Sequence, residues 1–209
     1  MPKRTSGELL SSALSAKPWK YDLISVGASA GGLLALSEVL RPLPARMPAI
    51  VVVQHLDPTH ESHLASLLSR KTGQQVKQAE HNEPILPGVV YIAPPDEHLL
   101  VGVGKIQLAH SQLIHFSRPS IDLMFESVAG MYGTRSIGLI LSGSNRDGSV
   151  GIRAIYEAGG TTVAQDPATA PFKTMPQAAI DTGCVNIVAP IEELGCVLIK
   201  LCTGEYATL

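Results

Sequence analysis

Three side chains in this sequence have the chemistry of a hydrolytic triad: a serine, a histidine and an aspartate. Ser29 lies in "GASAG", a G-x-S-x-G pattern whose glycines relieve crowding in a sharp turn and expose the hydroxyl. His55 follows the apolar run "AIVVVQ", and Asp147 lies within "SGSNRDG". In such a triad the histidine removes the serine proton, and the aspartate orients the imidazole and stabilises its charged form.

Each of these three residues follows a predicted strand, and this shared placement supports the triad. The strands are "DLISV", "AIVVV" and "SIGLIL", which precede Ser29, His55 and Asp147. Open parallel sheets place their sites beyond the carboxyl ends of the strands. We therefore predict that the three side chains meet at one edge of a sheet. Their order, Ser, His, Asp, disfavours the α/β-hydrolases, in which the acid precedes the histidine.

The glycine-rich turn has two other interpretations. It could bind phosphate through its backbone N–H groups, as strand-to-helix turns do in nucleotide-binding proteins. However, no lysine follows Gly32 as a P-loop requires, and Ser29 stands where the dinucleotide pattern needs its middle glycine. The serine could also simply cap the next helix. The case for a nucleophile therefore depends on the histidine and the aspartate.

A serine hydrolase also needs donors for the negative charge that develops on the ester oxygen. Two groups of backbone N–H are available. The first comprises Ala30 and Gly31 at the start of the predicted helix, and the second lies in the loop 142–145, which includes Ser144 and Asn145. We expect the oxyanion to bind at one of these two places.

Two further segments are candidates for the wall of the cleft. Arg118, Ser120 and Asp122 occur in "RPSID", which is also a plausible start of a helix. Met175 precedes a proline, and a methionine in such a place commonly serves in packing. For both segments two interpretations stay open: the side chains line the cleft, or they serve only to start a helix or to pack the core.

Other acidic and histidine residues compete with the triad. Asp166 also follows a strand, but "QDPAT" equally predicts a plain turn. His55, His60 and His63 together resemble a metal-binding cluster, yet Asp57-Pro58 predicts an N-cap that places His60 and His63 on the following helix. We therefore expect neither a metal nor any other cofactor.

The elements that must position the triad alternate regularly along the chain. Short β-branched runs at 22–26, 49–53, 136–141, 161–165 and 185–189 are each followed by a helical pattern. This alternation predicts an α/β fold: a doubly wound, mainly parallel sheet with helices on both faces. Residues 89–110 break the rhythm and predict a strand and then a β-hairpin near 98–109. We expect one catalytic domain over residues 21–209, preceded by a flexible tail or linker remnant at 1–20.

Composition excludes several classes of function. The chain has 209 residues and a net charge of −2, with both signs interspersed, so it carries no broad surface for nucleic acid or anionic membranes. No apolar run approaches ~20 residues, and the first twenty residues lack a signal-peptide pattern. We expect a cytoplasmic protein without membrane insertion. The three cysteines, odd in number and not spaced for zinc, predict packed thiols.

Taken together, the motifs resemble a known family. The segments "ISVGASAGG", "VVVQHL", "PGVVYIAPPDEHLLV", "RPSIDLMFESVA", "GLILSGSNRDGSVGIRAIYEAGG" and "AQDPATAPFKTMPQAAI" are similar, in this order, to the catalytic domain of CheB-type chemotaxis receptor methylesterases. The resemblance covers residues 21 to about 203. It implies hydrolysis of glutamate γ-methyl esters on the cytoplasmic domains of chemoreceptors, often with deamidation of receptor glutamines, by a cofactor-free triad of Ser29, His55 and Asp147. We expect a monomer whose partners are these methylated receptors. The alternative is a relative without catalysis, or with altered specificity, that binds a partner through the same cleft.

One position departs from the family pattern. The family's acid loop usually has G-x-G-x-D-G, whereas Asn145 replaces the middle glycine here. If that position needs a positive φ, asparagine is among the least costly replacements, so we expect the turn to survive. The substitution bears on the width of the cleft. The neighbouring Arg146 either pairs with an acidic receptor surface or points into solvent.

Regulation is the last expectation. Family members with a receiver domain carry it ahead of the catalytic part, and its phosphorylation relieves occlusion of the active site. About twenty residues precede the first predicted strand here, too few to bury a separate core. We expect the active site of this chain to be open.

Overall fold

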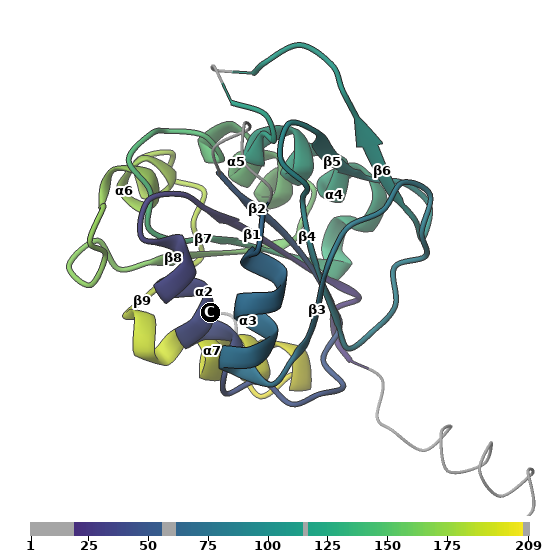
Figure 1. The fold of residues 1–209 in the computed structure, drawn as a ribbon. Helices are drawn as coiled ribbons and strands as arrows, with labels where there is room; N and C mark the ends of the chain where they lie inside the picture. The colour runs from purple at the N-terminus through teal and green to yellow at the C-terminus, as the bar shows by residue number, and fades with distance from the viewer. Residues whose placement is uncertain (1–18, 56–61, 115–116, 207–209) are drawn as a thin grey trace, which may run out of the picture.

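A single seven-stranded parallel sheet organises the protein (Figure 1). The computed structural model describes residues 19–55, 62–114 and 117–206. Across the sheet the strand order is β3-β4-β2-β1-β7-β8-β9, and every pairing is parallel. The bounds are β1 Leu23–Ala28, β2 Ala49–Gln54, β3 Gln75–Gln78, β4 Val89–Ile92, β7 Ser136–Ile140, β8 Thr161–Gln165 and β9 Ile187–Ala189.

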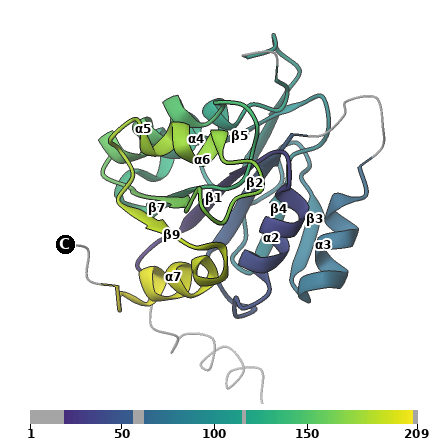
Figure 2. The same ribbon diagram turned by 90° about the vertical axis from the view of Figure 1, so that its left-hand side faces the viewer.

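Helices cover both faces of the sheet, which confirms the predicted doubly wound α/β fold (Figure 2). One face carries α2 Gly32–Leu40, α3 Leu64–Thr72 and α7 Ile191–Thr203. The other carries α4 Ile121–Tyr132, α5 Ser149–Glu157 and α6 Thr174–Ile180, and a short 3₁₀ turn at Gly133–Arg135 follows α4. Side chains alternate between the faces of a strand, so β1 packs Ile24 toward the first group of helices and Leu23 toward the second.

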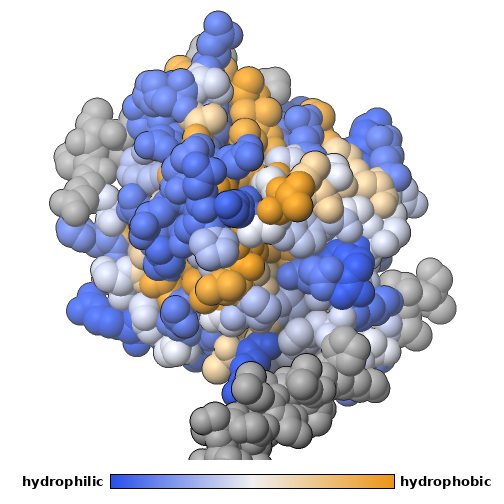
Figure 3. All heavy atoms as spheres, turned by 90° about the vertical axis from the view of Figure 1, so that its right-hand side faces the viewer, coloured by the Kyte–Doolittle hydropathy of each residue, from blue (hydrophilic) through white to orange (hydrophobic). Residues whose placement is uncertain are grey.

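The predicted hairpin is present. β5 His98–Val101 pairs antiparallel with β6 Ile106–Ala109, and Leu99 and Ile106 are buried with the α4 side of the core. Pattern reasoning missed β3, because "QVKQ" at the edge of the sheet is polar and no residue of it is fully buried. On the side of the molecule seen in Figure 3, hydrophobic patches lie between hydrophilic regions.

The predicted tail is only partly visible, since residues 1–18 lie outside the described residues. Trp19 packs against the core, and the N–H of Lys20 donates to the carbonyl of Cys202 at 2.9 Å. Within the part of the chain that the structure describes, no helix is both long and apolar enough to span a membrane.

The cysteines are free thiols, but they are not uniformly packed. Cys202 is buried, and burial raises the pKa of its thiol to about 12. Cys184 is half-buried. Cys196 is exposed on α7, so the expectation of a packed thiol is wrong there.

Candidate active site

The three predicted catalytic residues lie at one edge of the sheet, where neighbouring strands end. Ser29 follows β1, which lies between β2 and β7. The N–H of His55 donates to the carbonyl of Ala28 at 3.1 Å, and the N–H of Ser29 donates to the carbonyl of Ser142 at 3.0 Å. The loop that begins at Ser142 carries Asp147.

His55 and Asp147 form a buried hydrogen-bonded pair. Nε2 of His55 lies 2.8 Å from Oδ2 of Asp147, and only 1 % of the aspartate side chain is exposed. The start of α4 holds this carboxylate, because the N–H groups of Ile121 and Asp122 donate to it at 2.8 and 3.0 Å, and the Ser120 hydroxyl at 3.2 Å. Burial alone raises the pKa of Asp147, but the hydrogen bonds from His55 and from these N–H groups outweigh burial and lower it. The carboxylate is therefore ionised at neutral pH.

An ionised Asp147 determines which nitrogen of His55 is basic. Its oxygen can only accept, so Nε2 carries the proton and Nδ1 is the ring nitrogen that has the lone pair. Nδ2 of Asn145 lies 3.2 Å from Nδ1. The N–H of Asp147 donates to Oδ1 of Asn145 at 3.2 Å, which assigns the amide nitrogen to the side facing the imidazole. Asn145 therefore donates to the basic nitrogen of His55.

The Ser29 hydroxyl is the part of the triad that remains unconnected. Ser29 is half-buried, and among the described residues its hydroxyl makes no hydrogen bond to His55. Its backbone is nevertheless held close to the histidine, because Nε2 of Gln54 donates to the carbonyl of Ser29 at 2.8 Å and to that of His55 at 2.9 Å. Gln54 is a site residue that sequence reasoning missed; the available signal was a polar side chain at the end of an otherwise apolar strand.

The turn after Ser29 has the geometry of an anion-binding turn. In the described part of the chain, the N–H groups of Ala30 and Gly31 donate to no other residue. Gly31 has φ 77°, a conformation that favours glycine. A Cβ on Gly32 would lie 1.7 Å from Oε1 of Gln54, so any side chain there would displace the glutamine. This turn therefore offers two free donors beside the hydroxyl.

In the acid loop, the substitution of asparagine for glycine is structurally undemanding. Asn145 is not among the residues with positive φ, so its backbone conformation is open to any residue. Ser144 is exposed beside it. Met175 is 1 % exposed, and its N–H donates to the carbonyl of Gly143 at 3.0 Å, which places it in the packing beneath the loop.

The polar side chains of the "RPSID" segment make their contacts within the protein. Arg118 donates through Nε and Nη2 to Oδ1 of Asp96 at 2.9 and 2.6 Å, so its charge is already paired. Ser120 is the N-cap of α4, which agrees with the helix-start interpretation of this segment. Asp122 is buried and accepts the N–H of Gly151 at 2.7 Å. Burial, together with the negative charge of Asp147, raises the pKa of Asp122 to about 6, although the hydrogen bond from Gly151 by itself lowers it.

The competing candidates take other positions. Oδ1 of Asp166 accepts the N–H of Ala168 at 2.8 Å in a local turn, whereas Asp147 holds His55. His63 is the N-cap of α3 and not part of the helix, while His60 and Asp57-Pro58 lie outside the described residues. No metal-binding group of three or more His, Cys, Asp or Glu side chains occurs in the described ranges.

Comparisons with known proteins find relatives over most of the chain. A family model described as CheB methylesterase matches residues 24–198. The crystal structure of the Thermotoga maritima CheB methylesterase catalytic domain superposes with a TM-score of 0.82 at 34 % identity, covering 87 % of this chain and 98 % of that one.

Two named relatives are similar to this chain in sequence. A protein-glutamate methylesterase/protein-glutamine glutaminase 2 from Anaeromyxobacter dehalogenans is 40 % identical over 183 residues, which cover 87 % of this chain and 54 % of that protein. A putative protein-glutamate methylesterase/protein-glutamine glutaminase from Leptospira interrogans is 38 % identical over 183 residues, covering 87 % of this chain and 95 % of the relative. The chain thus spans about half of the first relative and nearly all of the second.

Proposed function

Because the chain belongs to the CheB methylesterase family, we propose that it hydrolyses glutamate γ-methyl esters on the cytoplasmic domains of chemoreceptors. Such a substrate places the enzyme in the cytoplasm. The observation that carries the proposal is the 2.8 Å pair between His55 and an ionised Asp147, at the strand ends beside Ser29. We assign these three residues the roles of base, acid and nucleophile.

In the first half of the reaction, Oγ of Ser29 attacks the ester carbonyl carbon while Nδ1 of His55 takes the hydroxyl proton. The carbonyl oxygen becomes an oxyanion, which the N–H groups of Ala30 and Gly31 stabilise. The imidazolium then returns the proton to the departing methoxide, and methanol leaves. A glutamyl ester of Ser29 remains on the enzyme.

In the second half, water attacks this acyl-enzyme and gives one proton to Nδ1. The imidazolium returns that proton to the departing Oγ of Ser29, and the product carboxylic acid leaves and ionises to glutamate. The base here is Nδ1, whereas serine proteases use Nε2 and bind their aspartate through Nδ1. The roles of the two nitrogens are exchanged because His55 presents Nε2 to Asp147.

Asn145 must move before this reaction starts. Nδ1 has one lone pair, which the Asn145 amide occupies at 3.2 Å, and the Ser29 hydroxyl needs that lone pair to lose its proton. The described geometry is therefore a resting arrangement, in which the amide and the hydroxyl compete for the base.

A second activity follows from the same chemistry. The relatives from Anaeromyxobacter and Leptospira are named glutaminases as well as methylesterases. Attack of Ser29 on a glutamine side-chain amide would release ammonia in place of methanol and leave the same acyl-enzyme. We propose deamidation of receptor glutamines as this second activity.

The decisive experiment measures methanol released from methylated receptor membranes. Wild type should release it, whereas Ser29→Ala and His55→Ala should not. Ser66→Ala removes an equally simple hydroxyl on α3 and should match wild type. Methanol release by Ser29→Ala at the wild-type rate would disprove the assignment of the nucleophile.

A further inference from the structure

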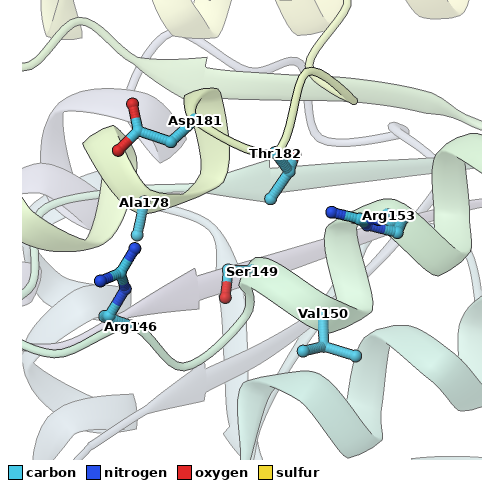
Figure 4. A pocket seen from close by; sticks show the side chains of 7 residues that line it. All are labelled: Arg146, Ser149, Val150, Arg153, Ala178, Asp181 and Thr182. Atoms are coloured by element: carbon cyan, nitrogen blue, oxygen red, sulfur yellow. The ribbon is translucent and has the colours of Figure 1, made fainter.

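A pocket beside the acid loop carries positive charge that the proposed mechanism does not use. Its volume is about 480 Å³, and it lies between α5 and α6 (Figure 4). Arg146 and Arg153 stand on opposite sides of it. The remaining lining residues are Ser149, Val150, Ala178, Asp181 and Thr182.

Neither guanidinium is neutralised within the described ranges of the chain. Some arginines of the protein have carboxylate partners: Arg41 pairs with Glu38, Arg118 with Asp96, and Arg135 with Asp22. Arg146 and Arg153 are exposed and form no ion pair or hydrogen bond through their guanidinium groups with any described residue.

Among the described residues that line the pocket with them, one is acidic. Asp181 lines the pocket, and its Oδ1 accepts the side-chain N–H of Gln177 at 2.8 Å. Within this pocket two cations face one carboxylate. The adjoining cavity adds Asp122 and Asp147, but both carboxylates are buried and already accept hydrogen bonds within the protein. The Ser149 hydroxyl adds a donor that is not engaged with another described residue, while the Thr182 hydroxyl already donates to the carbonyl of Ala179 at 2.6 Å.

This lining matches a carboxylate on a short aliphatic stem. Guanidinium groups bind carboxylates through paired N–H donors, and the pairs are stronger than neutral hydrogen bonds. Val150 and Ala178 offer small apolar surfaces for the methylene groups of a glutamate or aspartate. Val150 and Ala178 together offer too little apolar surface to bind a large apolar side chain.

The pocket is continuous with the catalytic residues. A second cavity of about 300 Å³ shares Arg146, Ser149 and Val150 with it and extends to Asp122, Asn145 and Asp147. A protein segment whose ester reaches the base would therefore place neighbouring side chains over the two arginines.

We propose that Arg146 and Arg153 bind a carboxylate of the protein substrate next to the esterified glutamate, so that the enzyme prefers esters within acidic segments. The proposal rests on the proposed function, since it names the kind of peptide that the same site accepts. It also resolves the two interpretations of Arg146 in favour of substrate contact.

Binding tests the proposal independently of catalysis. Ser29→Ala protein is titrated with a fluorescent peptide that carries a glutamate γ-methyl ester between flanking glutamates, and with a twin whose flanking residues are glutamines. We expect the acidic peptide to bind about three- to tenfold more tightly at low salt, because partly exposed ion pairs contribute modestly. The difference should shrink toward parity at high salt.

Charge variants identify the pocket as the source. In the Ser29→Ala background, Arg146→Gln combined with Arg153→Gln should abolish the preference, with an unchanged circular dichroism spectrum. Arg70→Gln removes an exposed arginine from α3 on the other face of the sheet, and it should keep the preference. Arg146→Glu with Arg153→Glu should reverse it toward a twin with flanking lysines.

Two results would overturn the proposal: equal binding of the acidic and neutral peptides at low salt, or a preference that persists without both arginines. Failure of the proposed function has a different signature. If wild type releases no methanol from the acidic ester peptide although the binding preference is present and arginine-dependent, the pocket assignment holds and the methylesterase assignment falls.

Discussion

Asn145 donates its side-chain amide to Nδ1 of His55 at 3.2 Å, on the side of the ring opposite to Asp147. Both ring nitrogens are thus engaged, and the base is held in one tautomer and one orientation. The same hydrogen bond occupies the lone pair that the Ser29 hydroxyl requires. Asn145 therefore orients the imidazole and also prevents Nδ1 from accepting the Ser29 proton while the hydrogen bond lasts.

Removing the amide should release the base. We expect Asn145→Ala to raise kcat/KM for a small neutral ester about two- to tenfold, the equivalent of one ordinary hydrogen bond lost from the resting state. The backbone at this position does not have a positive φ, so alanine fits. Asn145→Asp, which has no donor and repels the carboxylate of Asp147, serves as the contrast and should not be activated. A fall in kcat for Asn145→Ala would mean that orientation of the ring outweighs restraint.

The proposed triad predicts non-additive losses. Ser29→Ala and His55→Ala should each lower turnover of the methyl ester by about 10⁴ to 10⁶, and the double variant should be little worse, because the nucleophile and its base act as one unit. Asp147→Asn should cost about 10⁴, since an amide can stabilise the wrong tautomer. Single-turnover methanol release measures all four variants. Additive losses in the double variant would show that Ser29 and His55 do not cooperate.

Gln54 should affect turnover more than it affects stability. Gln54→Met keeps the volume but leaves the carbonyls of Ser29 and His55 without their shared donor, so we expect kcat to fall about ten- to a hundredfold with little change in KM. Gln74 is a matched control, because its Nε2 bridges the carbonyls of Leu40 and Leu43 in the same way, far from the site. Gln74→Met should lower the free energy of unfolding comparably and keep kcat. Equal effects of the two variants on kcat would contradict a positioning role for Gln54.

Asp122 should make the free energy of unfolding depend on pH. Its folded pKa of about 6 lies above the value of about 3.9 expected in the unfolded chain, so the folded state binds more protons between these values. This contribution therefore stabilises the protein below about pH 4 relative to pH 8, and it is lost as pH rises through 6. Asp122→Asn keeps an acceptor for Gly151 and should raise the free energy of unfolding at pH 8 by about 1 to 3 kcal/mol. Urea unfolding at pH 8 and pH 4 should show this gain at the higher pH alone; a gain independent of pH would exclude titration of Asp122 as its cause.

Part of this protein was accessible from its sequence because local patterns have local causes. Buried parallel strands are apolar along their whole length, so "AIVVV" and "SIGLI" are visible without a structure. The polar residues that follow such strands share one edge of the sheet, which is why Ser29, His55 and Asp147 could be grouped together. The edge strand β3 was not predicted, because it is polar and its position is set by pairing with β4.

The tertiary structure alone decided how the side chains of the site interact. His55 and Asn145 are 90 residues apart in the chain, and no local pattern says which ring nitrogen faces Asp147 or that an amide meets the other. The raised pKa of Asp122 likewise depends on burial beside a second carboxylate that another loop delivers. Sequence periodicity indicates the buried strands and helices, whereas the edge strand β3 and the ångström-scale placement of side chains on separate loops arise only when the elements pack.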